Sequence, residues 1–396
     1  MERKAIEPRQ GWPATIEEQG LIYWKTELPD STVVPYWHES AYYSLSGAEV
    51  YDLEASVRIL VEMCVEAGDH IIEQNLFSEM GIPGWAVPRI KETWESEPPM
   101  LYGRFDLAYG HDGVPKLLEF NADTPTSLIE TAVQWHWVQD VFGDAGDQWN
   151  SVHERLVNRW KELEPRLPGT QLHFLHTSAE RSGEDFMTVG YLAETARQAG
   201  LTVQLLPIEQ LGYDEFVGFI DIEGAAVRSA FKLYPWEWML HEEFSEPMLH
   251  RMGVGMGKTL WIEPIWKMLW SNKGLLPVLW RLFPDHPNLL PAYFEHETHD
   301  TLTSFVRKPL LAREGADTTV VLDGAVVAEG PRQGYGGEGY VVHSYTDLGS
   351  YDGKGGSRPV VGAWVVDMEP AGAGIRESDG LITDNLSRFV PHAIEG

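Results

Sequence analysis

Cysteine, long apolar runs and basic residues are all scarce in this sequence. The one cysteine, Cys64, excludes an intrachain disulfide. It lies on the apolar face of an expected helix over residues 48–77, which indicates a small core residue rather than a nucleophile. No apolar run approaches the roughly 20 residues that a membrane-spanning helix needs, and the first residues, Met-Glu-Arg-Lys, lack an apolar signal region. We therefore expect a protein of the cytoplasm with no membrane partner.

Acidic residues outnumber basic ones by two to one. The chain has 60 Asp and Glu against 30 Lys and Arg, which gives a formal net charge of −30 at pH 7. Such a charge repels nucleic-acid backbones and anionic membrane surfaces, so neither is an expected partner. It favours cationic partners such as polyamines or other amines, although an effect on solubility would also account for much of it.

The chain is long enough for two or three domains, with 396 residues and no low-complexity tract. Residues 171–176, 184–198 and 202–206 have the patterns of a strand, a helix and a strand. This spacing predicts a βαβ unit with parallel strands. The expected helix begins with Glu184 and Asp185, which complement the helix dipole without any functional role, although ligands also bind at this end of parallel strands.

The strongest local pattern runs from Met100 to Glu130. Two stretches, residues 101–109 and 114–122, alternate apolar and polar side chains and flank an Asp-Gly turn signal at Asp112-Gly113. This combination predicts a β-hairpin. Within its second strand we expect Leu118 and Phe120 to share the apolar face.

The polar residues of this hairpin gather on one face. If the turn closes on Tyr109 and Val114, Arg104 lies opposite Glu119. Two carboxylates and an amide oxygen, from Asp106, Glu119 and Asn121, suit Mg²⁺, and an adjacent arginine suits an anion. A half-solvated hairpin with a surface salt bridge is the alternative interpretation.

The segment after the hairpin predicts a helix over residues 125–142. Thr124 is placed to cap that helix, with Pro125 in its first turn, which would leave free backbone N–H groups near the carboxylates.

Two lysines later in the chain occupy unusual local settings. Lys273 falls in the first turn of a short helix that Ser271 can cap, where a cation opposes the helix dipole and needs an anionic partner. Lys308 interrupts the apolar strand Phe305–Leu310, although Pro309 also permits an exposed edge strand. The segment around Gly315 predicts a flexible turn whose N–H groups could close over phosphates, but it does not match the P-loop pattern.

These stretches resemble the synthetase half of glutathionylspermidine synthase and its stand-alone bacterial relatives. The matching segments, in order, are GRFD, LLEFNADTPTSLIE, SNKGLLPVLWRLFPDHPNLLPAYFE, FVRKPLLAREGADTTVV and AGAGIRESDGLITDNLSRFVPH. The resemblance implies a mixed α+β and α/β fold, ATP-grasp-like in a permuted order similar to eukaryotic glutathione synthetase. It divides the chain into residues 1–165 with the magnesium hairpin, a βαβ-containing pre-ATP-grasp-like substrate domain over 166–256, and a nucleotide-binding part with lid loops over 257–396.

The resemblance also implies roles for individual positions. Two Mg²⁺ ions would be held by Asp106, Glu119 and Asn121. The catalytic residues would be Arg104 and Arg376. ATP would be bound by Lys273, Lys308 and Gly315. A polyamine would be held by Glu184, Asp185 and Asp384.

The resemblance implies the activity of an ADP-forming ligase. Such an enzyme joins a small-molecule acid, expected to be peptide-like, to a polyamine or another amine through an acyl phosphate. Bifunctional family members also carry a cysteine amidase, which this sequence does not predict because its one cysteine lies on an apolar helix face. Two alternatives stay open: a catalytically silent protein that binds nucleotide or polyamine, and a carbohydrate hydrolase with two acids and aromatic platforms. The silent protein has no reason to keep all the site residues, and the hydrolase leaves the lysines unexplained.

Overall fold

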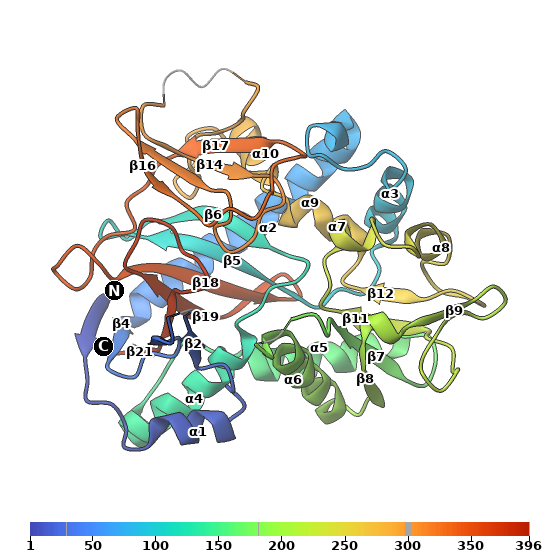
Figure 1. Ribbon diagram of the computed structural model, residues 1–396, viewed down its shortest axis with the longest axis horizontal. Helices are drawn as coiled ribbons and strands as arrows, with labels where there is room; N and C mark the ends of the chain where they lie inside the picture. The colour runs from blue at the N-terminus through green and yellow to red at the C-terminus, as the bar shows by residue number, and fades with distance from the viewer. Residues whose placement is uncertain (29, 181, 298–301, 396) are drawn as a thin grey trace.

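The computed structural model describes residues 1–28, 30–180, 182–297 and 302–395 (Figure 1). Its centre is an antiparallel five-stranded sheet in the order β20-β19-β18-β5-β6. The strands are β5 (Tyr102–Tyr109), β6 (Pro115–Asn121), β18 (Arg358–Val366), β19 (Glu369–Ser378) and β20 (Arg388–Val390). The predicted hairpin therefore shares one sheet with strands from the end of the chain.

The hairpin of β5 and β6 forms as expected, but its register differs from the prediction. Arg104 lies opposite Asn121, and Asp106 lies opposite Glu119. The pairing of Arg104 with Glu119 was wrong because a longer turn and a β-bulge each shift the register by one residue. The bulge leaves Leu118 without a cross-strand partner.

The same bulge changes which face of the hairpin Leu118 occupies. Leu118 packs against the small cluster of Ala108 and Val360, whereas Phe120 stacks on Phe105 in the main core with ring centroids 3.8 Å apart. The expectation that Leu118 and Phe120 share a face was therefore wrong. An extra residue in a strand reverses the alternation of side chains beyond it.

A second antiparallel sheet has the order β13-β17-β14-β15-β16. Its strands are β13 (Ala292–Phe294), β14 (Phe305–Pro309), β15 (Thr319–Leu322), β16 (Ala325–Glu329) and β17 (Tyr340–Ser344). Figure 1 shows these strands above β5 and β6. Lys308 is on an inner strand, since β14 pairs with both β15 and β17, so the edge-strand alternative was wrong. Pro309 is tolerated because it is the last residue of β14.

A parallel four-stranded sheet, in the order β12-β11-β7-β8, confirms the predicted βαβ unit. Its strands are β7 (Leu172–His176), β8 (Val203–Pro207), β11 (Ser229–Lys232) and β12 (Leu260–Ile262), and α6 (Glu184–Gln198) connects β7 to β8. The hairpin of β9 (Gly212–Asp214) and β10 (Gly218–Ile220) follows β8. The division of the chain at residues 165 and 256 stays a prediction.

Helices cover these sheets. The longest, α2 (Gly47–Gln74), begins at a capping box formed by Ser46 and Glu49. Its buried face includes Leu53, Val57 and Cys64, so the interpretation of Cys64 as a core residue is confirmed. The other helices are α1 (Trp12–Glu18), α3 (Val87–Ser96), α4 (Leu128–Phe142), α5 (Val152–Leu163), α7 (Trp236–Met239), α8 (Ser245–His250), α9 (Met268–Ser271) and α10 (Leu275–Leu282).

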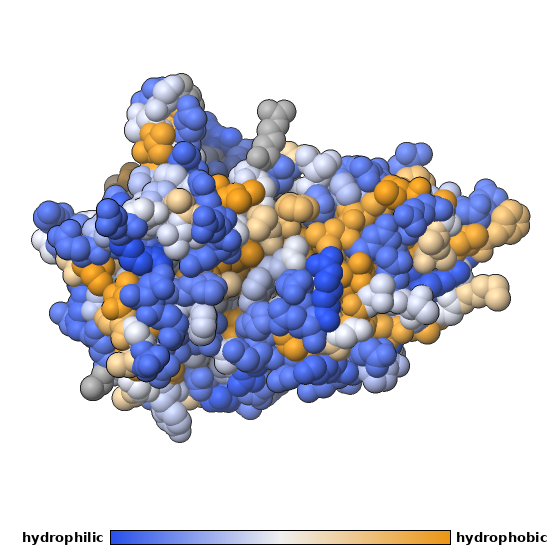
Figure 2. All heavy atoms as spheres, turned by 90° about the horizontal axis from the view of Figure 1, so that it is seen from below, coloured by the Kyte–Doolittle hydropathy of each residue, from blue (hydrophilic) through white to orange (hydrophobic). Residues whose placement is uncertain are grey.

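Two smaller sheets complete the described chain. One has the order β1-β4-β21, from β1 (Glu2–Ala5), β4 (Ala41–Leu45) and β21 (His392–Ile394), and the other pairs β2 (Lys25–Glu27) with β3 (Val33–Pro35). No helix within the described residues is both long enough and apolar enough to cross a membrane. Figure 2 shows a mostly hydrophilic face, with apolar atoms gathered toward the end where Figure 1 places the parallel sheet.

Two helix starts differ from the sequence expectation. α4 begins at Leu128 rather than Pro125, because Ser127 has a left-handed backbone with φ of 70° that interrupts any earlier turn. Thr124 is therefore not a cap. Ser271 ends α9 instead of capping a helix, and its hydroxyl accepts hydrogen bonds from the backbone N–H groups of Ala122 and Asp123.

Candidate functional site

A pocket lies between the central sheet and the second antiparallel sheet. One part of its lining is charged or polar and the other is apolar. The first part includes Asp106, Glu119, Lys273, Lys308, Glu314 and Arg376, and the second includes Leu118, Val306, Val320, Leu348, Val360, Leu381 and Ile382. The backbone of Gly315 also lines the pocket. Most of the residues predicted for metal, nucleotide and catalysis thus line one pocket, although they come from distant parts of the chain.

Asp106 is the most enclosed acid of this pocket, with 3 % of its surface exposed. Arg104 binds it through two hydrogen bonds, from Nε to Oδ1 at 2.6 Å and from Nη2 to Oδ2 at 3.0 Å. Burial alone would lower the pKa of Arg104, but the charge of Asp106 outweighs it and raises the pKa above its usual value. Arg376 reaches the same carboxylate from β19, with its Nη2 3.2 Å from Oδ2. The two arginines predicted at the reaction centre therefore meet at Asp106.

The approach of Arg104 to the sheet depends on a glycine opposite it. A Cβ atom at Gly362 on β18 would lie 2.9 Å from Cδ of Arg104. Any larger residue there would push the guanidinium away from Asp106, so this strand position needs glycine for space rather than for its backbone angles.

Asn121 completes a set of oxygen donors with Asp106 and Glu119. Its Nδ2 lies 3.3 Å from Oδ2 of Asp106 and 3.2 Å from Oε1 of Glu119. Turning the amide by half a rotation would present its oxygen to the same space, and such a set of hard oxygen ligands fits Mg²⁺. Among the described residues, no three His, Cys, Asp or Glu side chains are grouped as a metal site, so the amide and substrate oxygens have to complete the coordination.

Two lysines from the second half of the chain face Glu119. Nζ of Lys273 lies 3.3 Å from Oε2 of Glu119, and Nζ of Lys308 donates to the carbonyl of Leu118 at 3.3 Å. Burial would raise the pKa of Glu119, but the charges of Lys273 and Lys308, with smaller contributions from Asn121 and Arg376, hold it well below its usual range. Burial lowers the pKa of Lys308, and Glu119 opposes that shift. This end of the pocket is suited to a polyanion.

The loop after β14 closes one side of the pocket. Gly315 has a φ of 68°, and a Cβ there would lie 2.5 Å from Cγ2 of Ile382, so the close approach to the C-terminal segment requires glycine. Lys273 holds the loop by donating from Nζ to the carbonyl of Ala312 at 2.5 Å. Arg313 fastens it to two other segments, donating to Oγ1 of Thr124 and to Oε1 of Glu237, each at 2.9 Å.

The predicted amine residues divide into two groups in the structure. Glu184 and Asp185 open α6, and the charges of Arg376 and Glu314 reach Glu184, which places this pair beside the pocket. Burial, followed by the charge of Glu184, raises the pKa of Asp185 to about 7. Asp384 instead lines a different pocket, with Asp379 and Arg388. Its Oδ1 accepts hydrogen bonds within its own turn, from Leu386 N at 3.0 Å and from Ser387 Oγ at 3.3 Å.

The sequence analysis missed a third acid of this group, Glu130 in α4. Its side chain is fully buried and accepts hydrogen bonds from Tyr36 Oη at 2.6 Å and from Tyr23 Oη at 3.3 Å. Burial, with the charge of Glu184, raises the pKa of Glu130 to about 7. The sequence did contain an indication of this burial. Glu130 is the one charged residue in the stretch Leu-Ile-Glu-Thr-Ala-Val, and a helix over that stretch has no polar face on which it could lie.

A second missed pair anchors the segment after Asn121. Asp123 and Lys232 are both fully buried, with Nζ of Lys232 2.7 Å from Oδ1 of Asp123. The other oxygen of Asp123 accepts the backbone N–H of Trp236 at 3.0 Å. This pair joins the hairpin segment to β11 of the parallel sheet.

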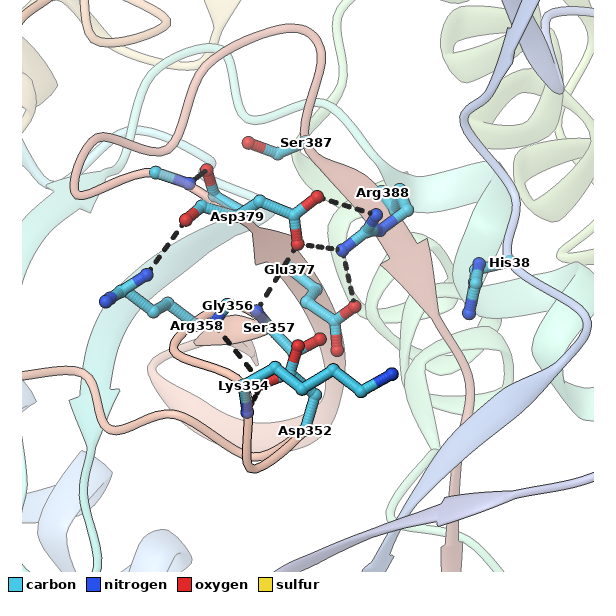
Figure 3. Close-up of polar contacts among 12 residues, drawn as sticks. His38, Asp352, Lys354, Gly356, Ser357, Arg358, Glu377, Asp379, Ser387 and Arg388 are labelled. Atoms are coloured by element: carbon cyan, nitrogen blue, oxygen red, sulfur yellow. Dashed lines mark hydrogen bonds and ion pairs between the residues drawn. The ribbon is translucent and has the colours of Figure 1, made fainter.

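The C-terminal wall of the pocket is held by the ion-pair cluster of Figure 3, which we call the C-terminal clasp: Arg388, Asp379, Glu377 and Ser357. Arg388 donates to both oxygens of Asp379, at 2.7 and 3.0 Å, and to the buried Glu377 at 2.9 Å. Asp379 also accepts the backbone N–H of Ser357 at 3.3 Å. The clasp fixes both ends of the turn that carries the lining residues Leu381 and Ile382.

The fold resembles that of a protein of known structure. A glutathione synthetase-like effector from Globodera pallida has a similar structure, with a TM-score of 0.56, 98 % of each chain covered and 9 % sequence identity. At that identity the likeness concerns the fold alone, a mixed α/β architecture of the glutathione synthetase kind.

The chain belongs to the glutathionylspermidine synthase preATP-grasp family, whose sequence model matches residues 3–395. It is 37 % identical over 374 residues to a Haemophilus influenzae protein named "Putative acid--amine ligase", covering 92 % of each chain. It is 27 % identical over 406 residues to the trypanothione synthetase of Crithidia fasciculata, covering 94 % of this chain but 58 % of that protein. The resemblance identified from the sequence is thereby confirmed.

Proposed function

We propose that this protein joins a carboxylic acid to an amine at the expense of ATP, releasing ADP and phosphate. The observation that carries the proposal is the convergence of Glu119 and Asp106 from the hairpin with Lys273 and Lys308 from later segments on one pocket. The named activities of the relatives, an acid–amine ligase and a trypanothione synthetase, support the same reaction class. The order of these groups along the chain, with carboxylates early and lysines late, supports the permuted ATP-grasp arrangement.

The first step transfers the γ-phosphoryl group of ATP to the carboxylate of the acid. An oxygen of that carboxylate forms a bond to phosphorus, the bond from phosphorus to the β–γ bridging oxygen breaks, and ADP leaves. Such a transfer needs positioning and charge neutralisation more than covalent help from the protein. Lys273 and Lys308 are placed to bind the phosphates, and Arg104 and Arg376 to stabilise charge on the transferred group.

Asp106, Glu119 and Asn121 are the residues that would hold Mg²⁺, and we propose two ions. Bound Mg²⁺ would neutralise negative charge on the nucleotide phosphates. Asp106 is held by two arginines, and Glu119 faces a lysine. The charges of Lys273 and Lys308 hold the pKa of Glu119 well below its usual range, so Glu119 is available as an ionised ligand.

The second step forms the amide. The amine nitrogen attacks the acyl carbon, the bond from that carbon to the phosphate oxygen breaks, and phosphate leaves with the electron pair while the nitrogen gives up a proton. Glu184 and Asp185 lie beside the pocket and are suited to hold a cationic amine near the acyl group. A polyamine or another amine with a second positive charge is therefore the proposed nucleophile, and a peptide-like acid the proposed electrophile.

The test is a screen of acid and amine pairs with ATP and Mg²⁺, with ADP release as the readout and mass spectrometry of the products. We expect ADP release that requires both members of one pair, and a product heavier than the acid by the amine less one water. Nucleotide binding without ADP release for any pair would instead favour the catalytically silent alternative, so Mg-ATP binding is measured on the same protein.

A further inference from the structure

His343 is a buried polar residue of the pocket with no role in the proposed reaction. It lies on β17 directly opposite Val306 of β14, on the pocket face, with 2 % of its surface exposed. Its Nε2 has no hydrogen-bond partner. Among the described residues that line this pocket, His343 is the one with a buried, unpartnered side-chain nitrogen or oxygen. A buried polar atom of this kind, facing a binding pocket, indicates a partner that arrives with the ligand.

The contacts of the ring define what that partner must be. Nδ1 lies 2.9 Å from the backbone carbonyl of Ser344. A carbonyl oxygen only accepts, so the proton is on Nδ1, and Nε2 of a neutral ring is an acceptor. Burial, and then the charge of Lys308, lowers the pKa of His343 to about 3, which keeps the ring neutral. Nε2 therefore calls for a hydrogen-bond donor and would repel a carbonyl or phosphate oxygen.

The position of His343 in the pocket indicates which part of a nucleotide it meets. Lys308 lies two residues from Val306 on the same face of β14, so His343 is about 7 Å further along the sheet than the phosphate-binding lysine. The walls around it are the apolar side chains of Val306, Val320, Leu348 and Val360. A nucleotide with its phosphates on the lysines and its base directed along β14 would bring that base against these walls. Figure 1 shows β14 and β17 side by side over β6.

We propose that Nε2 of His343 accepts a hydrogen bond from the exocyclic amino group of adenine and so makes the pocket selective for ATP over nucleotides with a carbonyl at that position. This inference rests on the proposed function, because it assumes that the pocket binds a nucleoside triphosphate. Sites built to hydrogen-bond a particular substrate group reject analogues that lack it, since the buried partner is then left unpaired.

The experiment compares ATP with ITP, which differs from it in carrying a carbonyl in place of the amino group and a proton on the adjacent ring nitrogen. Binding of each Mg-nucleotide is measured by calorimetry for the wild-type protein, His343→Leu and His343→Gln. We expect the wild type to bind ATP at least tenfold more tightly than ITP. His343→Leu should weaken ATP binding about tenfold and leave ITP binding within twofold. The amide of His343→Gln can donate or accept a hydrogen bond, so this variant should bind the two nucleotides with affinities within threefold of each other. It also keeps a polar side chain at this position and serves as the control if the leucine variant misfolds.

Four results would overturn the inference, and the fourth would also overturn the proposed function. If His343→Leu loses the same affinity for ATP as for ITP, Nε2 does not contact the amino group. It would then bind a group that both nucleotides share, such as a ribose hydroxyl, or the ring would serve only for packing. If His343→Leu binds both ATP and ITP as the wild type does, Nε2 does not contact the nucleotide and is hydrogen-bonded to a water molecule instead. A wild-type protein that binds ATP without preferring it to ITP would remove the selectivity and leave the proposed ligase function intact. Failure of the wild type to bind either nucleotide would overturn both proposals together.

Discussion

Lys273 and Glu119 form an ion pair, 3.3 Å from Nζ to Oε2, inside the proposed active site. In the proposed reaction these two groups bind different partners, the lysine a phosphate and the glutamate a metal ion. Their contact keeps both charges balanced, and in the proposed reaction Mg-nucleotide would replace this contact at little electrostatic cost.

The first prediction concerns the carboxylate of this pair. Glu119→Gln keeps the shape of the side chain and removes the negative charge, which leaves Lys273, Lys308 and Arg376 without a shared counter-charge. We expect the rate of substrate-dependent ADP release to fall at least about 100-fold, and added Mg²⁺ not to restore it. The matched control is Glu329→Gln on the exposed strand β16. An unchanged rate would remove Glu119 from the metal site.

The second prediction concerns Lys308. Lys308→Ala removes a half-buried positive charge from the phosphate end of the pocket, so ADP release should fall at least about 100-fold while the circular dichroism spectrum is unchanged. The comparison is Lys161→Ala on the exposed face of α5, which should keep wild-type activity. Full activity of Lys308→Ala would contradict the assignment of this lysine to the nucleotide.

The third prediction concerns the pH dependence of folding. Burial and Glu184 raise the pKa of Glu130 from 4.5 to about 7. Because the folded state holds the proton more tightly, the stability from Glu130 is complete below about pH 4.5 and is lost as the pH rises to about 7. Glu130→Gln should remove this loss and be more stable than wild type at pH 8, by up to about 3 kcal/mol. The tyrosines that donate to Glu130 can also hydrogen-bond an amide.

The measurement for Glu130→Gln is urea unfolding of the variant and the wild type at pH 5 and pH 8. Glu194→Gln, an exposed residue of α6, serves as the control and should follow the wild type at both pH values. If the glutamine variant loses as much stability between these pH values as the wild type does, Glu130 is not the group that titrates.

The fourth prediction concerns the buried pair of Asp123 and Lys232. Asp123→Asn leaves the ammonium group of Lys232 in the core without a counter-charge, and this should lower the free energy of unfolding by about 3–5 kcal/mol. Adding Lys232→Met to this variant should recover most of the loss, because no uncompensated charge then remains buried. If Asp123→Asn alone lowers the free energy of unfolding by less than about 1 kcal/mol, the pair is not needed to hold the segment after β6 against the parallel sheet.

Patterns within short stretches could be predicted from the sequence. The alternation around Asp112-Gly113 placed the hairpin correctly, and residues 171–206 gave the parallel βαβ unit. The resemblance of five segments to one family added what the patterns could not, that the hairpin and Lys308 belong to the same site. The roles of these residues stay predictions until the variants are measured.

Other features could not be predicted because they depend on contacts that no local pattern encodes. The bulge at Leu118 changes the register by one residue, and nothing in the alternation of the strand marks it. The partnership of Asp123 with Lys232 joins the segment after β6 to β11 of the parallel sheet. Glu130 was overlooked because the tyrosines that make its burial possible come from the start of the chain.

The position of β5 in the central sheet affects how the protein is made. β5 is completed by β18, which leaves the ribosome more than two hundred residues later. During that interval one edge of the hairpin has no hydrogen-bonding neighbour, and an open strand edge is a template for association with other chains. We expect this protein to depend on chaperones, or on a low rate of synthesis, more than its composition alone suggests.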